Sequence, residues 1–191
     1  MRCFLKIIFL IIVLLFFSFC KSGSLILQNP SGVDVNIVLV DHKIQFQVPS
    51  NWKTYYSAKR YFHFIAKSED NIYGPQLEYR GLQNTSKTKE ERNLYANGWY
   101  KAIEINFPKW KFLKKDYEEI PYNEIVIYSY DFLGEFFDGN KKIKKLGYLK
   151  FIEDRIHAIY YTAEESEFDV NLPSFLKINK KIIYNISAKP Y

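Results

Sequence analysis

Three histidines, His42, His63 and His157, are the side chains best suited to acid–base or metal chemistry. No two of them stand four residues apart, so they form no helical metal-binding pair. His63 and His157 fall on expected strands and could meet across a sheet, where Glu78 or Asp131 would complete a metal or acid–base site. Isolated strand histidines are the commoner explanation of this pattern. Because the chain also lacks a phosphate loop, a zinc spacing and a nucleophile elbow, we expect no catalysis, no metal and no cofactor.

Aromatic side chains are the second chemically suggestive feature, since the chain contains 16 Tyr, 16 Phe and 3 Trp. Tyrosines fall on or beside expected strands in numbers beyond what a core with partnered hydroxyls needs. An exposed row of tyrosines suits a binding surface, or a groove for a sugar or an apolar ligand. Amphipathic tyrosines at sheet edges are the structural alternative. The candidate binding residues are Tyr128, Tyr130, Tyr160 and Tyr161.

Both cysteines, Cys3 and Cys20, lie in the N-terminal segment. The rest of the chain can therefore form neither a disulfide nor a cysteine metal site. Arg2 and Lys6 flank the start of an apolar run, Ile7–Phe19. The run is shorter than the roughly 20 residues of a membrane span, so it is typical of an export signal rather than of a permanent anchor.

The end of this run resembles a bacterial lipoprotein signal, because a cysteine closes it and Ser22-Gly23-Ser24 follow shortly after. The resemblance implies that residues 1–19 are removed and that Cys20 carries lipid, which would anchor an exported protein in the cell envelope. Phe19 departs from the pattern, since the residue before the cysteine is normally small. The alternative is ordinary cleavage after Ser24, which would give a secreted or periplasmic protein.

Charge argues against a nucleic-acid partner. The chain carries +6, and removal of residues 1–20, with Arg2 and Lys6, leaves 25 basic against 21 acidic residues, or +4. This excess is mild, and the lysines are spread along the chain. The densest run, Lys141–Lys145, falls in an expected turn, where we predict that it is simply solvated.

The elements that must position these residues centre on three consecutive strands. Asn123–Phe132, Lys145–Glu153 and Arg155–Ala163 are rich in aromatic and β-branched residues with apolar groups on both faces, which predicts a sheet covered on both sides. Upstream, we expect strands at Val35–Val40 and Lys43–Val48, a hairpin of Arg60–Ala66 with Gln76–Leu82, and a strand at Trp110–Tyr117. We place Lys43–Val48 in the same sheet as the three central strands.

One long helix is expected from Lys89 to Asn106. Thr88 and Glu91 have capping-box spacing at its start, and Pro108 stops it. Gly98 in its middle suggests a close approach to the sheet. The expected apolar face comprises Leu94, Tyr95, Trp99, Ala102, Ile103 and Ile105.

The chain therefore divides into a signal peptide at 1–20, a linker or tether at 21–34, a single α+β domain at 35–184 and a tail at 185–191. Near the end of the domain, Glu164–Phe168 should form one turn of helix. Leu172–Lys181 should form a second short helix, with Pro173 near its start.

The order of elements resembles the PsbP/Mog1-like α/β/α sandwich family. The features that carry the likeness are Val48-Pro49 followed by Trp52, a hairpin, the helix at 89–106, the strands of 122–163 and a closing helix around Phe175. The resemblance covers about 43–182. It implies an antiparallel sheet flanked by one long helix and a short C-terminal helix, in a protein that binds or assists others without catalysis. No functional residue of the family can be carried over, and a lipocalin-like or cystatin-like fold is the alternative.

Two functions fit these expectations best. The first is an exported, membrane-tethered binding or accessory protein of the cell envelope, which should show a filled core and an exposed aromatic patch. The second is a carrier of a small apolar or sugar ligand, with a groove between helix and sheet of several hundred Å³. A hydrolase is a third alternative. The sequence identifies neither the partner nor the ligand.

Overall fold

The structure is a computed structural model, and it describes residues 25–28, 34–39, 42–57, 62–67, 73–122 and 125–184. The expected signal peptide, Cys20 and the expected tail lie outside these residues. The described residues form two antiparallel sheets and two helices, so the predicted α+β class is confirmed. None of the helices in the described ranges is both long enough and apolar enough to cross a membrane.

Seven strands form the larger sheet, and each neighbouring pair is antiparallel. Their order across the sheet is β4 (Lys53–Ser57), β5 (Phe62–Lys67), β6 (Gln76–Gln83), β10 (Arg155–Glu164), β9 (Lys141–Ile152), β8 (Ile125–Asp138) and β7 (Lys111–Tyr122). The three expected central strands are confirmed as β8, β9 and β10, and the expected hairpin as β5 and β6. Strand β4 was not expected from the sequence.

Four strands form a second sheet, in the order β1 (Leu25–Gln28), β2 (Asp34–Leu39), β3 (Ile44–Pro49) and β11 (Ile183–Tyr184). The placement of Lys43–Val48 in the main sheet is therefore wrong. After β3 the backbone turns sharply, with the N–H of Trp52 donating to the carbonyl of Pro49 at 3.0 Å, and the next strand joins the other sheet. Strand β1 also falls within the range expected to be a linker, where it pairs with β2.

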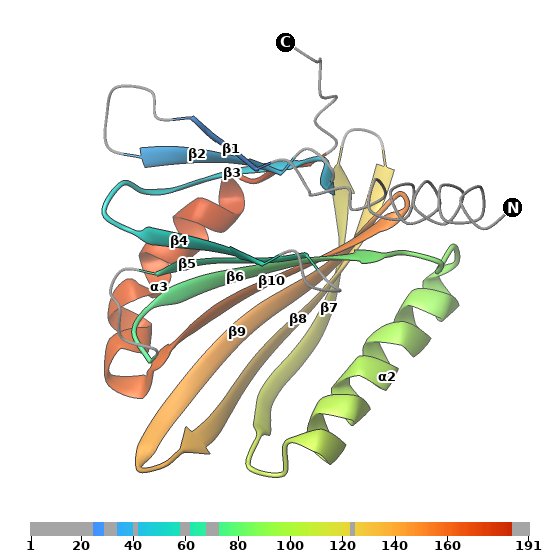
Figure 1. Ribbon diagram of the computed structural model, residues 1–191. Coiled ribbons are helices and arrows are strands. Elements are labelled where there is room, and N and C mark those ends of the chain that lie inside the picture. Colours follow the sequence, from blue (N-terminus) through green and yellow to red (C-terminus); the bar gives the residue numbers. More distant parts are fainter. Residues whose placement is uncertain are drawn as a thin grey trace, which may run out of the picture.

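Two layers of apolar side chains hold these elements together. Helix α2 (Lys89–Asn106) covers one face of the seven-stranded sheet (Figure 1), and the core beneath it is largely aromatic. Helix α3 (Glu165–Lys180) and the four-stranded sheet cover the other face, where aliphatic and aromatic residues of both sheets meet. The sheet is therefore covered on both sides, as the apolar groups on both faces of its strands predict.

Helix α2 begins and ends where the sequence predicts. The hydroxyl of Thr88 accepts from the N–H of Glu91 at 3.2 Å, and the Glu91 carboxylate accepts from the N–H of Thr88 at 3.0 Å, which completes the capping box. The N–H of Phe107 donates to the carbonyl of Ile103 at 2.9 Å and closes the last turn before Pro108. These local hydrogen bonds satisfy backbone groups that a helix end leaves unpaired.

The buried face of α2 matches the predicted one only in part: Tyr95 and Trp99 pack against the core as predicted, but other residues do not. Ala96 and Tyr100 are buried against the sheet, whereas Leu94 and Ile105 are 75% and 78% exposed. Gly98 is exposed too, and a Cβ added there would meet nothing within 4 Å, so it does not serve a close approach to the sheet. Apolar residues occur on two sides of this helix, and the side that carries Ala96 and Tyr100, about one turn apart, is the one buried against the sheet.

The expected pair of short C-terminal helices is one continuous helix, α3. Pro173 lies inside it on the exposed side, and Phe168, Phe175 and Ile178 are buried on the opposite side. Burial of this apolar stripe outweighs the local cost of the proline, which removes one helical hydrogen bond.

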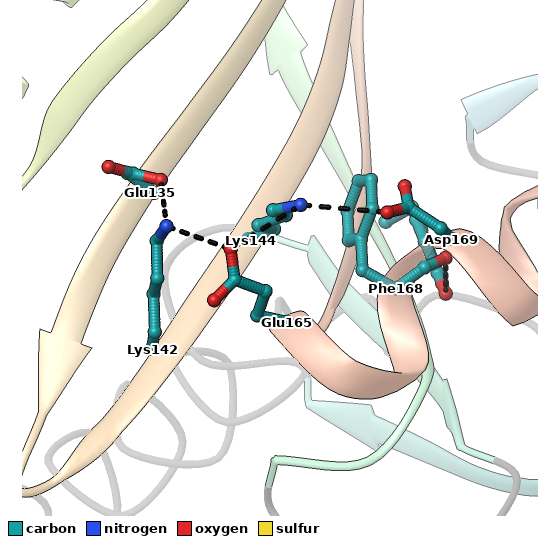
Figure 2. A network of polar contacts seen from close by, with 7 residues as sticks. Glu135, Lys142, Lys144, Glu165, Phe168 and Asp169 are labelled. Atoms are coloured by element: carbon teal, nitrogen blue, oxygen red, sulfur yellow. Dashed lines mark hydrogen bonds and ion pairs between the residues drawn. The ribbon is translucent and has the colours of Figure 1, made fainter.

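The lysine-rich segment is also structured differently from the prediction. Lys142 and Lys144 lie on β9 and form ion pairs with carboxylates instead of pointing freely into solvent (Figure 2). Lys142 contacts Glu135 at 2.9 Å and Glu165 at 2.8 Å, while Lys144 lies 3.6 Å from both Glu165 and Asp169. The network joins the start of α3 to the β8–β9 hairpin, so these charges are structural.

Candidate functional site

A groove of about 630 Å³ lies between the C-terminal half of α2 and the seven-stranded sheet. Its walls are mostly apolar and come from α2, the segment after it, β8 and β10: Trp99, Ile103, Phe107, Pro108, Trp110, Phe132, Phe136, Phe137 and Tyr160. Polar side chains also line it: Arg80, Asn106, Lys109, Asp138 and Lys145. We call this space the α2 groove. A hollow of this size with aromatic walls and a few charged groups has the character of a ligand site.

Stacked rings form the inside of the α2 groove. Trp99 lies 5.0 Å from Phe132 between ring centroids and stacks on Tyr160 at 6.2 Å with an interplanar angle of 12°. Trp110 stacks on Phe136 at 5.0 Å. Contacts of this kind fix ring positions beyond what burial alone does, so the walls are shaped before any ligand arrives.

Two glycines make room for these rings on the sheet. A Cβ at Gly147 would lie 2.1 Å from Cε1 of Phe132, and a Cβ at Gly134 would lie 2.6 Å from Cζ2 of Trp110. An isolated glycine inside a strand often marks such a close approach. Gly134 and Gly147 therefore allow the rings to lie flat against β8 and β9.

Three charged side chains stand at the sheet side of the α2 groove. Glu78 is only 6% exposed, and its Oε1 accepts from Nε of Arg80 at 2.6 Å. Its Oε2 lies 3.6 Å from Nζ of Lys145. Both cations also lie over the ring of Tyr160, Arg80 at 5.9 Å and Lys145 at 4.7 Å. Two cations and one carboxylate leave a net positive charge beside the aromatic wall.

The predicted binding tyrosines do not share one surface. Tyr160 lines the α2 groove, while Tyr130 and Tyr128 lie beneath the first half of α2. Tyr130 hydrogen-bonds Asn93, and burial raises the pKa of its hydroxyl to about 12. Tyr161 is fully buried in the core on the opposite side of the sheet, where its hydroxyl donates to the carbonyl of Phe168 at 3.0 Å. A binding role for these tyrosines stays a prediction.

His157 likewise remains apart from the predicted carboxylates. His157 is 1% exposed on the α3 side of the sheet, and its Nδ1 lies 3.0 Å from the hydroxyl of Tyr79. Burial lowers the pKa of His157 to about 3, so its imidazole is neutral at physiological pH. Glu78 pairs with Arg80, and Asp131 accepts from the hydroxyl of Ser129 at 2.9 Å. This arrangement offers no acid–base pair at His157.

The strand register also does not place the backbones of His63 and His157 opposite the same residue of β6, the strand between them. His63 pairs with Arg80, whereas His157 pairs with Gly81, the next residue along β6. Among the residues that the structure describes, no three His, Cys, Asp or Glu side chains come together as a metal ion would require.

The sequence predicts a groove between helix and sheet for a ligand carrier, but it does not predict most of the residues that line the α2 groove. Trp110, Phe132 and Lys145 come from segments that meet only in the folded sheet. Gly134 and Gly147 were the local signals that could have revealed it, because each interrupts an otherwise aromatic or aliphatic strand.

No protein-family model and no curated protein sequence matches the chain. Solved structures do match. One is the cyanobacterial PsbP of Synechocystis sp. PCC 6803, with a TM-score of 0.58, 9% identity and coverage of 87% of this chain and 95% of the other. Another is LpqN of Mycobacterium tuberculosis, a protein involved in cell envelope biogenesis, with a TM-score of 0.53, 12% identity and coverage of 84% and 89%. At these identities the likeness shows the fold alone, and the fold is the PsbP-like sandwich that the sequence predicts.

Proposed function

We propose that this chain is an exported, non-catalytic binding protein of the cell envelope that holds an apolar ligand in the α2 groove. The observation that carries the proposal is a preformed space of about 630 Å³ with aromatic walls. A ligand carrier was expected to have such a space, and a purely accessory protein a filled core. The groove therefore favours the carrier.

The comparisons support the setting of this function. LpqN is described as involved in cell envelope biogenesis, and it shares the fold of this chain. The N-terminal sequence independently resembles a lipoprotein signal. The shared fold and the N-terminal sequence both favour the cell envelope as the place where the protein binds its ligand.

A lipid on Cys20 would complete the arrangement. Strand β1 begins at Leu25, so the tether would consist of residues 21–24 and would reach at most about 14 Å when extended. Such a short tether would hold the folded domain close to the membrane. Helix α2, which supplies one wall of the α2 groove, lies on the side of the seven-stranded sheet away from β1 (Figure 1).

A neutral apolar dye tests the binding function. N-phenyl-1-naphthylamine fluoresces strongly only when it leaves water, so it should show saturable binding to the purified domain. Asn106→Trp places a large ring at a position that lines the α2 groove and should weaken this binding at least about tenfold, since the loss of one well-filled apolar contact exceeds 1.4 kcal/mol.

The matched control puts the same side chain one residue earlier. Ile105 is 78% exposed and does not line the groove, so Ile105→Trp should bind the dye as the parent does. Absence of saturable dye binding in the parent, or equal weakening by both variants, would refute a ligand site in the α2 groove.

A further inference from the structure

We infer that the ligand of the α2 groove is a single-chain amphiphile, with one long hydrocarbon chain and one monoanionic head group held by Arg80 and Lys145. This inference rests on the proposed function and gives its ligand a chemical class. It follows from three features of the groove: its charge, its length and its ring-lined wall.

The charge comes from a cation pair that Glu78 holds in place. Glu78 is buried and uses one oxygen for Nε of Arg80 and the other for Nζ of Lys145. The guanidinium of Arg80 has five donors, and only Nε is engaged within the described part of the chain. Its terminal nitrogens are therefore free to take an anion in a two-point contact, as arginine does with carboxylates.

The net charge of this cluster selects for one negative charge. Among the described residues of the cluster, Arg80 and Lys145 carry +2 and Glu78 carries −1, so a monoanion balances these three charges. Both cations lie over the ring of Tyr160, whose face attracts positive charge and which also lines the apolar wall. The head-group site and the apolar space therefore meet at one residue.

The shape of the space suits a chain rather than a compact ligand. A second, more open hollow of about 550 Å³ continues along α2 past Leu94 and Gly98, and Trp99 lines both hollows. Together they follow α2 from residue 91 to residue 106, which is about 22 Å of helix. A ligand that reaches along both must be long.

The walls distinguish a hydrocarbon chain from an extended peptide. A peptide carries an N–H and a carbonyl at nearly every residue, and each must find a partner when buried. The ring-lined wall of Trp99, Phe132 and Tyr160 offers few such partners. A hydrocarbon chain needs none, so it is the occupant that this wall fits.

Competition between two matched ligands tests the inference. Hexadecanoate and hexadecanol have the same chain and differ in the charge of the head group, and each would displace N-phenyl-1-naphthylamine from the full-length mature protein below its aggregation limit. Hexadecanoate should bind at least about tenfold more tightly, as expected for a hydrogen bond to a charged group. The double variant Arg80→Gln with Lys145→Gln should lose this preference and keep its affinity for hexadecanol.

Two further variants separate head-group recognition from a general effect. Lys101→Gln removes one positive charge from an exposed position of α2 that lines neither hollow, so it should leave the preference unchanged. Glu78→Gln removes the competing carboxylate and should increase the preference for hexadecanoate, provided that circular dichroism shows an intact fold.

The outcomes distinguish the inference from the function on which it rests. Equal affinity for the two ligands, or a preference that survives Arg80→Gln with Lys145→Gln, would overturn the anionic head group while leaving a ligand site in place. Tighter binding of hexadecyltrimethylammonium than of hexadecanoate would overturn it as well. If the dye itself fails to bind, the proposed function fails and the inference fails with it.

Discussion

A methyl group added at Gly98 and one added at Gly147 should change the free energy of unfolding in opposite directions. Gly98→Ala should raise it by about 1 kcal/mol, because the new Cβ meets nothing and the helix gains propensity. Gly147→Ala should lower it by about 1–3 kcal/mol, because the new Cβ presses on Phe132 and Tyr160. Urea denaturation measures both. A neutral Gly147→Ala would contradict the flat ring packing that forms the α2 groove.

His157 should make the domain lose stability in acid. Its pKa is about 3 when folded, because burial disfavours the charged imidazole, against an ordinary value of 6.5. Between these values the unfolded chain binds more protons, so stability is complete above pH 6.5 and falls as the pH drops toward 3. The loss attributable to His157 at pH 5 should be about 2 kcal/mol.

His157→Gln provides the comparison for this pH effect. Glutamine can still hydrogen-bond the hydroxyl of Tyr79 but does not titrate, while the neighbouring His42, Lys150 and Arg155 remain in both proteins. Urea denaturation at pH 7 and pH 5 should therefore show a smaller loss in the variant. An identical loss in both proteins would mean that His157 does not cause it.

At the scale of elements, the packing of α2 predicts a contrast between two charge substitutions. Ala96 is fully buried against the sheet, so Ala96→Asp should cost several kcal/mol of unfolding free energy. Ile105 is on the exposed side, so Ile105→Asp should change stability by less than about 0.5 kcal/mol. Thermal denaturation of the two variants decides this. Similar melting of both would mean that α2 does not bury the face described.

Elements that depend on local signals could be predicted from the sequence, and those that depend on distant contacts could not. Helix α2 was found at its correct limits because Thr88, Glu91 and Pro108 act within a few residues. Strand β3 was recognised, yet its sheet was misassigned, because alternation shows that a strand is half-buried without showing what it pairs with. The sequence predicts a break in helix α3 between Phe168 and Leu172, just before Pro173, because local signals do not show how strongly Phe168 and Phe175 are held in the core.

The candidate site depends even more than the elements on distant contacts, which the sequence does not reveal. Tyr160 was singled out as a binding residue, and it does line the α2 groove. Tyr161, its neighbour in sequence, points to the other face of the sheet because side chains alternate along a strand. The partners of Tyr160, which include Arg80, Trp99 and Lys145, come from three other elements and could be assembled only by the fold.

At the scale of the whole molecule, the N-terminus predicts how the protein is held. If Cys20 is lipidated, the mature protein should partition into detergent and have the mass of a chain that begins at Cys20 with acyl groups added. At least two acyl chains are needed for stable anchoring, since one alone binds only marginally. Cys20→Ala should move the protein to the aqueous phase. A mature chain that begins at Leu25, or aqueous partitioning with Cys20 intact, would instead establish simple secretion.

The central claim, that the α2 groove is a ligand site, can be tested most directly through the tryptophans. Trp99 and Trp110 line the groove, whereas Trp52 packs against the core on the other side of the sheet. Hexadecanol brominated in mid-chain quenches tryptophan fluorescence on contact and carries no charge that could favour other sites. We predict saturable quenching in the parent and in Trp52→Phe, and its loss in the variant with Trp99→Phe and Trp110→Phe. Quenching that never saturates, or equal quenching when Trp52 is the remaining tryptophan, would contradict the claim.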